Sequence, residues 1–487
     1  MGFDGALQYE VLLFFFFLIF IFPGGRNSVR GIEGALHVLG RVREGRFAAE
    51  VLREAGAAME PGDLSLASSL VYLVLRREEM WRNVAEGFLQ SGGARRPHAA
   101  KNTAKRPASA GLRSLPQRVA DCLLAGTAGL LELRHFADGV LVNGLLEHLK
   151  REGHGKFVSL VNAVLHTVGE RGAERVEALH RSAALEDRVL WAGVPVWSLP
   201  AWTKSWKRAE LTELFELMRI PPASSLRVSP GREEALRDLL QERGVEAEPS
   251  DLTSALRLSG TVLPSAVPGF EQGWCTVQTE GSILAASLAE RFWKGGSVLD
   301  MCSGRGVKAG QILQAIPESR LECWELSRGR HLSAVREMRR LGVEPRAKLL
   351  CGNALELEPQ TSPALILLDA PCSGSGTWNR KPESKWQLSW SRFDRLVAVQ
   401  KSLLARALDL CAPNGIIIYV TCSLLRQENE NVVAEALSSR SDCVEVPVPW
   451  PASGAFRRGR PWGTYVWPVS PWLDGFYCSI IMKRAEV

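Results

Sequence analysis

Apolar residues in the first third of the chain recur at the three- and four-residue spacing of amphipathic helices. From Arg30 to about Gln90 the repeated apolar positions are Leu36, Val38, Leu39, Val51, Leu52, Leu64, Leu66, Leu70, Val71, Leu73, Val74 and Leu75. The spacing resumes in 119–131 and continues through 140–149 and 157–168. We therefore predict an all-α domain of packed helices over residues 30–172.

A different pattern begins after this helical region. A charged link leads to short alternating elements, with a strand expected at Ser225–Pro230 and a helix through Leu236, Leu239 and Leu240. We expect residues 173–270 to form a linker and a small α+β subdomain.

From residue 271 to the C-terminus, apolar runs rich in β-branched residues alternate with helix-length segments. This alternation is typical of an α/β domain with a parallel sheet covered by helices on both faces. The expected strands are Ser297–Met301, Leu321–Glu325, Ala347–Cys351, Leu365–Asp369 and Ile416–Thr421. A final pair, around Val444 and at Gly475–Met482, is expected to add edge strands.

Two segments do not fit these patterns. The apolar run Val11–Phe22 is shorter than the roughly 20 residues that a membrane-spanning helix needs, and it lacks the basic start of a signal peptide. We treat residues 1–29 as an apolar extension, which a wrongly assigned start codon would also explain, and expect no stable membrane partner. Residues 91–117 are rich in Gly, Pro, Ala, Arg and Lys and are expected to form a basic loop.

Composition narrows the function classes only modestly. A length of 487 residues indicates several domains, and a formal charge of +6 suits either a polyanionic partner or an evenly charged surface. The ten cysteines are scattered singly, without a C-x-x-C pair, which argues against a metal site and against a disulfide framework. Free thiols of this kind favour a cytoplasmic protein.

Ligands of an open α/β sheet bind beyond the carboxyl ends of its strands. After the first expected strand, Gly304 and Gly306 allow the backbone to approach a ligand closely. Glu325 ends the second strand about 20 residues later, where an acidic group binds ribose hydroxyls, and Asn353 follows the third. Because the turn lacks G-x-G-x-x-G spacing, a dinucleotide is disfavoured and an adenosyl sulfonium remains consistent.

The fourth and fifth strands each end in a cysteine, Cys372 after Asp369 and Cys422 after Thr421. A thiolate that attacks C6 of cytosine turns C5 into a carbon nucleophile that can accept a methyl group. The thiolate needs a positive field, for which Lys308, Arg380 and Lys381 are candidates. Asp369 is placed to hydrogen-bond the N3/N4 edge of a base, which must reach the site unstacked.

These residues resemble the RNA cytosine-C5 methyltransferases, and within them the RsmB/Sun type that modifies bacterial small-subunit ribosomal RNA. The resemblance runs from about Arg30 to the C-terminus. Its most specific segments are DAPCSGSG at 369–376, RKPESKW at 380–386 and TCSLLRQENENVV at 421–433.

The resemblance implies a Rossmann-like catalytic domain over 271–487, with Cys422 as nucleophile, Cys372 assisting product release, and Asp369 and Lys308 in the site. It implies S-adenosyl-L-methionine (SAM) as cofactor and a NusB-like RNA-binding domain at 30–172. The expected SAM contacts are Cys302, Ser303, Gly304, Arg305, Gly306, Val307, Lys308, Glu325, Asn353 and Asp369. We expect a monomer that acts on 16S ribosomal RNA and not on DNA.

Two departures from the family pattern concern the cofactor. The family's first loop reads C-A-A-P-G-G-K, whereas Cys302–Lys308 reads CSGRGVK, so Arg305 replaces a proline and Val307 a glycine. If the backbone needed a positive φ at Val307, SAM affinity would fall by on the order of 1 kcal/mol or more. Asn353 stands where an aspartate is usual, which is a mild change because an amide oxygen also accepts hydrogen bonds.

Three other functions compete with this interpretation. A cytosine-C5 DNA methyltransferase would use Cys372 as its nucleophile, but the TCS motif and the helical domain count against it. A transfer RNA cytosine-C5 methyltransferase shares the chemistry and differs only in substrate. An RNA-binding assembly factor with a decayed SAM loop is compatible with Arg305 and Val307, although both cysteines, Asp369 and Lys308 are retained.

Overall fold

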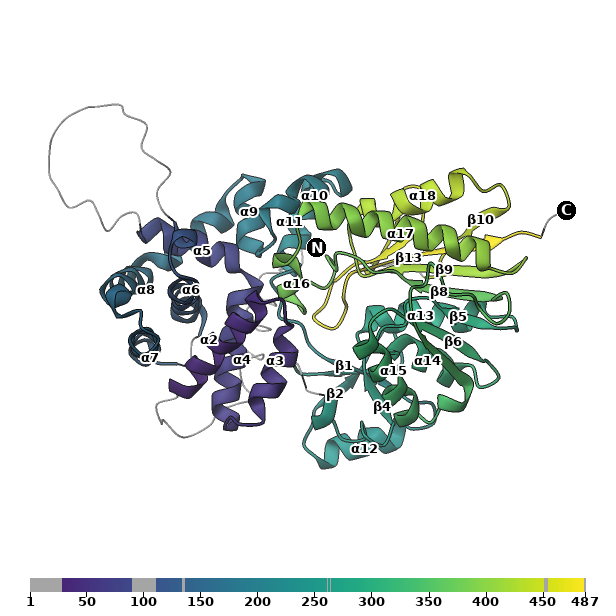
Figure 1. Cartoon of the computed structure of the whole chain (residues 1–487), viewed down its shortest axis with the longest axis horizontal. Coiled ribbons are helices and arrows are strands. Elements are labelled where there is room, and N and C mark those ends of the chain that lie inside the picture. The colour runs from purple at the N-terminus through teal and green to yellow at the C-terminus, as the bar shows by residue number, and fades with distance from the viewer. Residues whose placement is uncertain are drawn as a thin grey trace, which may run out of the picture. The chain divides into compact units, whose positions relative to one another are not determined.

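The computed structural model describes residues 29–89, 111–133, 136–260, 262, 264–450 and 454–485 (Figure 1). They fall into two compact units. The first ends at Leu199 and also contains Lys381–Gln387, and the second contains Pro200–Arg380 and Leu388–Val487. The apolar run Val11–Phe22 and residues 91–110 of the expected basic loop lie outside the described residues.

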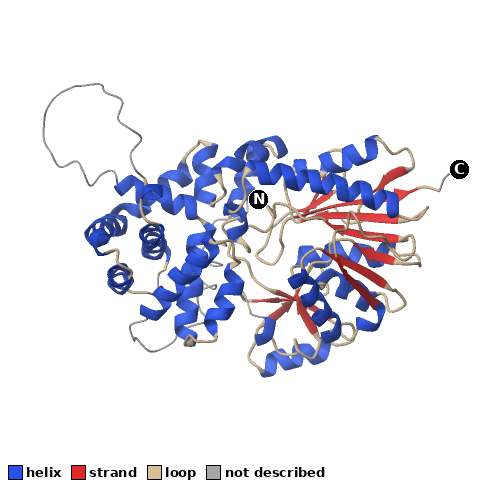
Figure 2. Ribbon diagram, viewed as in Figure 1, coloured by secondary structure: helices blue, strands red, loops and turns tan. Residues whose placement is uncertain are grey.

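The first unit is helical, as its apolar spacing predicts (Figure 2). Its helices are α2 (Val29–Arg43), α3 (Ala48–Gly56), α4 (Pro61–Arg76), α5 (Glu78–Leu89), α6 (Gln117–Glu132), α7 (Asp138–Arg151), α8 (Val158–Arg181) and α9 (Leu185–Ala192). Helix α6 is buried from Val119 to Gly129 and contacts α2, α4, α5, α7 and α8. A helix buried on all sides is the centre of its bundle. In the described part of the chain, no helix has the length and apolarity needed to cross a membrane.

A short helix from the RKPESKW segment, α16 (Pro382–Trp386), belongs to the first unit. The Lys385 ammonium donates to the carbonyl of Arg76 at 2.6 Å, and the Trp386 indole donates to the carbonyl of Leu75. Glu383 accepts from the backbone N–H of Ala48 at 3.2 Å. Since helix ends leave backbone groups without intrahelical partners, α16 caps the end of α4 and the start of α3.

The second unit begins with α10 (Leu199–Ser205) and α11 (Arg208–Leu217) and then forms a small antiparallel sheet. The strands are β1 (Ser225–Val228), β2 (Ala247–Pro249), β3 (Ala255–Leu258) and β4 (Cys275–Val277), in the order β2-β3-β1-β4. Helix α12 (Glu233–Glu242) packs on this sheet through Leu236 and Leu240. The predictions of β1 and α12 are confirmed. The other three strands have three or four residues each, too few for a periodic signal.

The large sheet contains all five predicted parallel strands. They are β5 (Val298–Asp300), β6 (Leu321–Glu325), β7 (Ala347–Cys351), β8 (Leu365–Asp369) and β9 (Ile416–Thr421), in the order β9-β8-β5-β6-β7. Helices α13 (Glu280–Phe292), α14 (Val307–Ala315) and α15 (Arg328–Arg340) cover one face (Figure 1). Helices α17 (Trp390–Leu410) and α18 (Glu430–Ser438) cover the other. Residues 365–368 of β8 are all buried, as expected of a strand covered on both faces.

The C-terminal strands differ from the prediction. Strand β13 (Phe476–Lys483) is not an edge strand, because it pairs with β9 on one side and with both β12 (Thr464–Val466) and β10 (Cys443–Val446) on the other. Strand β11 (Phe456–Arg458) pairs with β12 and was not predicted. Residues 476–481 of β13 are all buried, since an interior strand contacts both helical layers.

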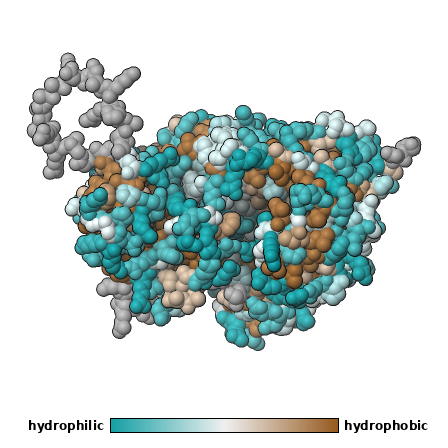
Figure 3. Space-filling model, in the orientation of Figure 1, coloured by the Kyte–Doolittle hydropathy of each residue, from teal (hydrophilic) through white to brown (hydrophobic). Residues whose placement is uncertain are grey.

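The face shown in Figure 3 mixes polar residues with small apolar patches.

Candidate functional site

The sequence motifs gather at one edge of the large sheet. Strands β9, β8, β5, β6 and β7 are consecutive and parallel, so their carboxyl ends lie along the same edge. The loops after these strands carry Cys422, Cys372, the turn at 301–306, Glu325 and Asn353, in that spatial order. The edge therefore brings the expected nucleophile and the expected cofactor residues into one site.

The two cysteines are in direct contact. Their sulfur atoms lie 3.1 Å apart, and both thiols are partly buried and free of disulfides. The loops that carry them are joined by backbone hydrogen bonds, from Ala370 to Val420 at 2.9 Å and from Gly376 to Cys422 at 3.0 Å. The hydrogen bond with Cys422, together with burial, raises the pKa of the Cys372 thiol. Both influences favour the protonated form of Cys372.

An ion pair lies beside the thiols. The Lys308 ammonium donates to Asp369 at 2.6 Å. Burial is the largest single influence on the pKa of Lys308 and lowers it. The charge of Asp369, the hydrogen bond with Asp369 and the charges of Cys422 and Asp300 together raise this pKa above its usual value. Lys308 therefore lies within electrostatic reach of Cys422, and its raised pKa favours the ammonium form. A cation at this distance favours the thiolate form of a cysteine.

The other two basic candidates lie elsewhere. The Arg380 guanidinium donates to Asp474 at 3.1 Å and to the carbonyl of Ala223 at 3.1 Å. Lys381 belongs to the first unit. The donors of Arg380 hold Asp474 and the chain before β1, and a role of Arg380 at the thiol stays a prediction.

The structure adds to this site a buried carboxylate that was not among the candidate residues. Asp300, the last residue of β5, is 1% exposed. Burial, and next the charge of Asp369, raise the pKa of Asp300 to about 7, although Lys308 opposes this. Asp300 therefore changes its protonation state near neutral pH. The only sequence signal was its position at the tip of the first strand.

The glycine turn has its left-handed residues at Gly304 and Gly306, with φ of 58° and 82°. Val307 is the first residue of α14 and its φ is not positive. The backbone strain that a positive φ at Val307 would cause is therefore absent. A Cβ at Gly304 would meet no atom within 4 Å, so the turn leaves open space there for a ligand. Arg305 is exposed on the same turn.

Glu325 is tied to this turn. Its carboxylate accepts from the backbone N–H groups of Gly304 at 3.0 Å and Ser327 at 2.7 Å, and it pairs with Arg330 at 2.8 Å. The next residue, Leu326, is 70% exposed. A fixed acceptor next to an exposed apolar side chain suits a nucleoside, which has a polar sugar and an apolar ring face.

Asn353 is more exposed than Glu325 and is partly used by its own turn. Its amide oxygen accepts from the N–H of Leu355 at 3.1 Å, and its amide nitrogen donates to Glu356 at 2.7 Å. An amide oxygen has two lone pairs, so one acceptor position remains for a ligand.

A second missed residue, Glu428, holds the two cysteine loops together. This glutamate is fully buried and accepts from the backbone N–H of Ser373 at 2.7 Å, from the Ser373 hydroxyl and from Gln400 at 3.0 Å. Gln400 also donates to the carbonyl of Pro371 at 2.8 Å. Glu428 lies in the QENEN segment after the nucleophile, where a run of acids and amides was the available signal.

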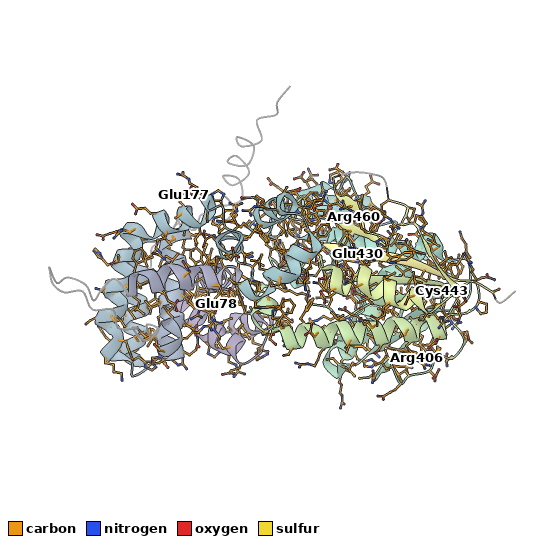
Figure 4. The ribbon with its side chains drawn as sticks, turned by 90° about the horizontal axis from the view of Figure 1, so that it is seen from above. Glu78, Glu177, Arg406, Glu430, Cys443 and Arg460 are labelled. Carbon is orange, nitrogen blue, oxygen red and sulfur yellow. The ribbon has the colours of Figure 1, made fainter. Side chains whose placement is uncertain are left out.

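The adjoining helix is anchored in the same way. Glu430, in the first turn of α18, accepts from the backbone N–H of Arg460 at 3.2 Å and from the Tyr465 hydroxyl (Figure 4). These bonds fix the start of α18 on the loop between β11 and β12.

We predict that Asp300→Asn changes how stability depends on pH. The folded protein keeps the Asp300 proton up to about pH 7, whereas the unfolded chain releases it near pH 3.8. This group's contribution to stability is thus fully present below pH 3.8 and is lost as pH rises to about 7. The melting temperature of Asp300→Asn minus that of the wild type should increase between about pH 4 and about pH 8. An unchanged difference would contradict the raised pKa.

Glu428→Ala should destabilise the protein by about 3 kcal/mol, because it leaves buried donors of Ser373 and Gln400 without an acceptor. The control is Glu435→Ala on α18, whose exposed ion pair with Lys401 is worth at most about 1 kcal/mol. The two variants can be compared by thermal or urea unfolding. Equal losses of stability would argue against the network.

Comparison with known proteins assigns the chain to a family. The model of the 16S rRNA methyltransferases RsmB/F matches residues 290–482. Ribosomal RNA small subunit methyltransferase B of Pectobacterium atrosepticum is 31% identical over 344 residues, which cover 67% of this chain and 73% of that protein. The same enzyme of Xanthomonas campestris is 27% identical, with coverages of 90% and 93%.

The fold agrees with these matches. The crystal structure of PH0851 is similar over 95% of this chain and all of its own, with a TM-score of 0.74 at 20% identity. Taken with the glycine turn and the paired cysteines, these similarities show that the chain belongs to the RsmB/F family of SAM-dependent RNA 5-methylcytosine methyltransferases.

Proposed function

We propose that the protein methylates C5 of a cytosine in 16S ribosomal RNA through a covalent bond between the Cys422 sulfur and C6 of the base. The observation that carries this proposal is the 3.1 Å contact between the Cys372 and Cys422 sulfurs, beside the Lys308–Asp369 ion pair. One cysteine in a cleft is commonly structural, but two in contact next to a cation provide a nucleophile and a second group for its release.

The cofactor-binding part of the site fits SAM. The turn Cys302–Lys308 would hold its methionine portion, Glu325 its ribose hydroxyls and Asn353 its adenine amino group, with Asp369 between cofactor and base. The fit rests on the open space at Gly304 and on the fixed carboxylate of Glu325. When bound, SAM supplies an electrophilic methyl group on a sulfonium.

The protein residues perform the remaining steps. The Cys422 thiolate, stabilised by Lys308, forms the S–C6 bond, and the electron pair of the C5=C6 bond makes C5 nucleophilic. Asp369 binds the N3/N4 edge and favours the protonated base during this attack. After methylation, the C5 proton leaves, the S–C6 bond breaks and the C5=C6 bond re-forms. Cys372 assists this release: its sulfur lies 3.1 Å from that of Cys422 and, in the thiolate form, would accept the proton from C5.

The rest of the chain would bring the RNA to this site. We assign residues 30–172 to a NusB-like RNA-binding domain, 173–270 to a linker with a small α+β subdomain and 271–487 to catalysis. The protein would act as a monomer in the cytoplasm. The base must leave its stack to reach Cys422, so a single-stranded or loop region of the RNA is the expected target.

The cysteine roles predict opposite behaviour of two variants. Cys422→Ala should abolish both methyl transfer and any covalent protein–RNA species, because no nucleophile remains. Cys372→Ala should accumulate the covalent species, because bond formation proceeds while release fails. Denaturing gel electrophoresis with labelled RNA measures both. If only Cys372→Ala lost the adduct, the two roles would be reversed.

The substrate prediction is tested with labelled SAM and unmodified 16S ribosomal RNA, with transfer RNA and DNA in parallel. Label should appear as 5-methylcytosine in ribosomal RNA alone, identified by nucleoside analysis. Label in transfer RNA would support the transfer RNA alternative. RNA binding without methylation of any substrate would support an assembly factor with a decayed SAM loop.

A further inference from the structure

A second concave site lies in the second unit, away from the cysteines. It is a hollow of about 300 Å³, the size of a small-ligand site. Four segments line it: the loop after β1, the residues before β4, the end of α14 and the residues between α15 and β7. The lining residues are Ser229, Pro230, Arg232, Gln272, Gly273, Trp274, Gln314, Leu341, Val343 and Arg346. They include two arginines and no carboxylate, so the hollow favours an anion.

The walls of the hollow are held by hydrogen bonds. Ser229 donates through its backbone to the carbonyl of Trp274 at 2.9 Å and through its hydroxyl to the carbonyl of Gly273 at 2.7 Å. Gln314 donates to the Ser229 hydroxyl oxygen at 2.9 Å. Gly273 has a φ of 74°, and a Cβ there would lie 2.3 Å from the carbonyl oxygen of Arg340. These contacts hold the small sheet against the ends of α14 and α15, so the hollow is already formed without a ligand.

The two arginines retain donors for a ligand. Arg346 donates to the carbonyls of Ile316 at 3.1 Å and Leu313 at 2.6 Å, which uses two of the five N–H groups of its guanidinium. Arg232 is exposed, lies 5.4 Å from the centre of the Trp274 ring and has no hydrogen-bond acceptor for its guanidinium among the described residues. The Arg232 guanidinium lies over the Trp274 ring, and arginine–aromatic pairs of this kind are used by proteins that bind single-stranded nucleic acid.

The hollow lies near the amino ends of the parallel strands, whereas the cysteines lie beyond the carboxyl ends. Arg346 immediately precedes β7, whose first residue, Ala347, pairs with Leu321 at the start of β6. Cys422 follows the last residue of β9. Parallel strands of five or six residues separate the two edges by roughly 17 Å. A ligand in the hollow is therefore not the methylated base.

We propose that this hollow binds a nucleotide of the RNA substrate at a distance from the target cytosine, with Arg232 and Arg346 on the phosphate and Trp274 against the base. The proposal rests on the proposed function, because it takes the ligand to be the same RNA. Phosphate suits guanidinium groups, which present paired donors. An acidic peptide would satisfy the arginines but has no ring that requires Trp274, so RNA is the better match.

The test compares Arg232→Ala with Arg237→Ala, an equal loss of charge on the exposed side of α12 outside the hollow. Two RNAs are used, a long fragment around the methylated cytosine and a short one with only that cytosine and its nearest neighbours. Affinity is measured by filter binding over a range of salt concentrations. Trp274→Leu, checked for an unchanged melting temperature, probes the stacking separately.

Arg232→Ala should weaken binding of the long RNA several-fold and lower the slope of log affinity against log salt by about 0.7, the value for one single-strand phosphate contact. Trp274→Leu should weaken the same binding on the order of ten-fold. Binding of the short RNA should not change. Equal effects of Arg232→Ala and Arg237→Ala, or equal effects on both RNAs, would overturn the proposal.

These outcomes are separable from failure of the proposed function, since RNA affinity is measured without methyl transfer. If wild-type protein does not methylate the RNA, the salt slope of Arg232→Ala still decides whether the hollow binds it. If methylation occurs and the slope is unchanged, only the hollow is excluded.

Discussion

The parallel pairing of β8 with β9 is the interaction on which the site depends. Asp369 pairs with Val420, so the two strands end almost level and their next residues include Cys372 and Cys422. Strand pairing alone does not fix side chains in the loops beyond it. The buried Glu428 adds that precision, because it binds the Cys372 loop from the segment that follows Cys422. A charged acceptor with several donors in a dry interior is costly to disrupt, so it keeps the two thiols in contact.

Three ionisable side chains lie together at the carboxyl ends of these strands, where burial limits their contact with water. Lys308, Asp369 and Asp300 lie within one electrostatic group, and their burial makes each charge depend on the others. The charge of Asp369 and its hydrogen bond raise the pKa of Lys308 and so favour the ammonium form against the effect of burial. Asp300 has no hydrogen-bonded cation among the described residues, and burial raises its pKa to about 7. The Lys308 ammonium is the positive group of this set, and its interaction with Cys422 favours a thiolate there.

The chain also links its two units through one short segment. It leaves the second unit after Arg380, contributes α16 to the first unit and returns at Leu388. Within the first unit, Lys385 and Trp386 satisfy the last carbonyls of α4. Residues 381–387, which follow the loop that carries Cys372 along the chain, thus supply hydrogen bonds within the helical unit.

The amino-acid sequence by itself determined the helical character of the first unit and the order of the five parallel strands. Regular spacing predicted the helices of the first unit and the five parallel strands, because burial of one face or of a whole strand imposes a period or a continuous apolar run. It also predicted that Cys372, Cys422, the glycine turn and Glu325 lie at strand ends, since topology brings such ends to one edge. Motif resemblance supplied the chemistry of the cysteines.

Only the tertiary structure decided which distant side chains meet. Three examples join residues far apart in the chain. Glu428 accepts a hydrogen bond from Ser373, Arg380 pairs with Asp474, and Arg232 and Arg346 line the same hollow. The place of β13 inside the sheet and the raised pKa of Asp300 likewise depend on neighbours that no local pattern specifies. Local periodicity reports whether a residue is buried, whereas partners and charge states follow from the packing of the whole domain.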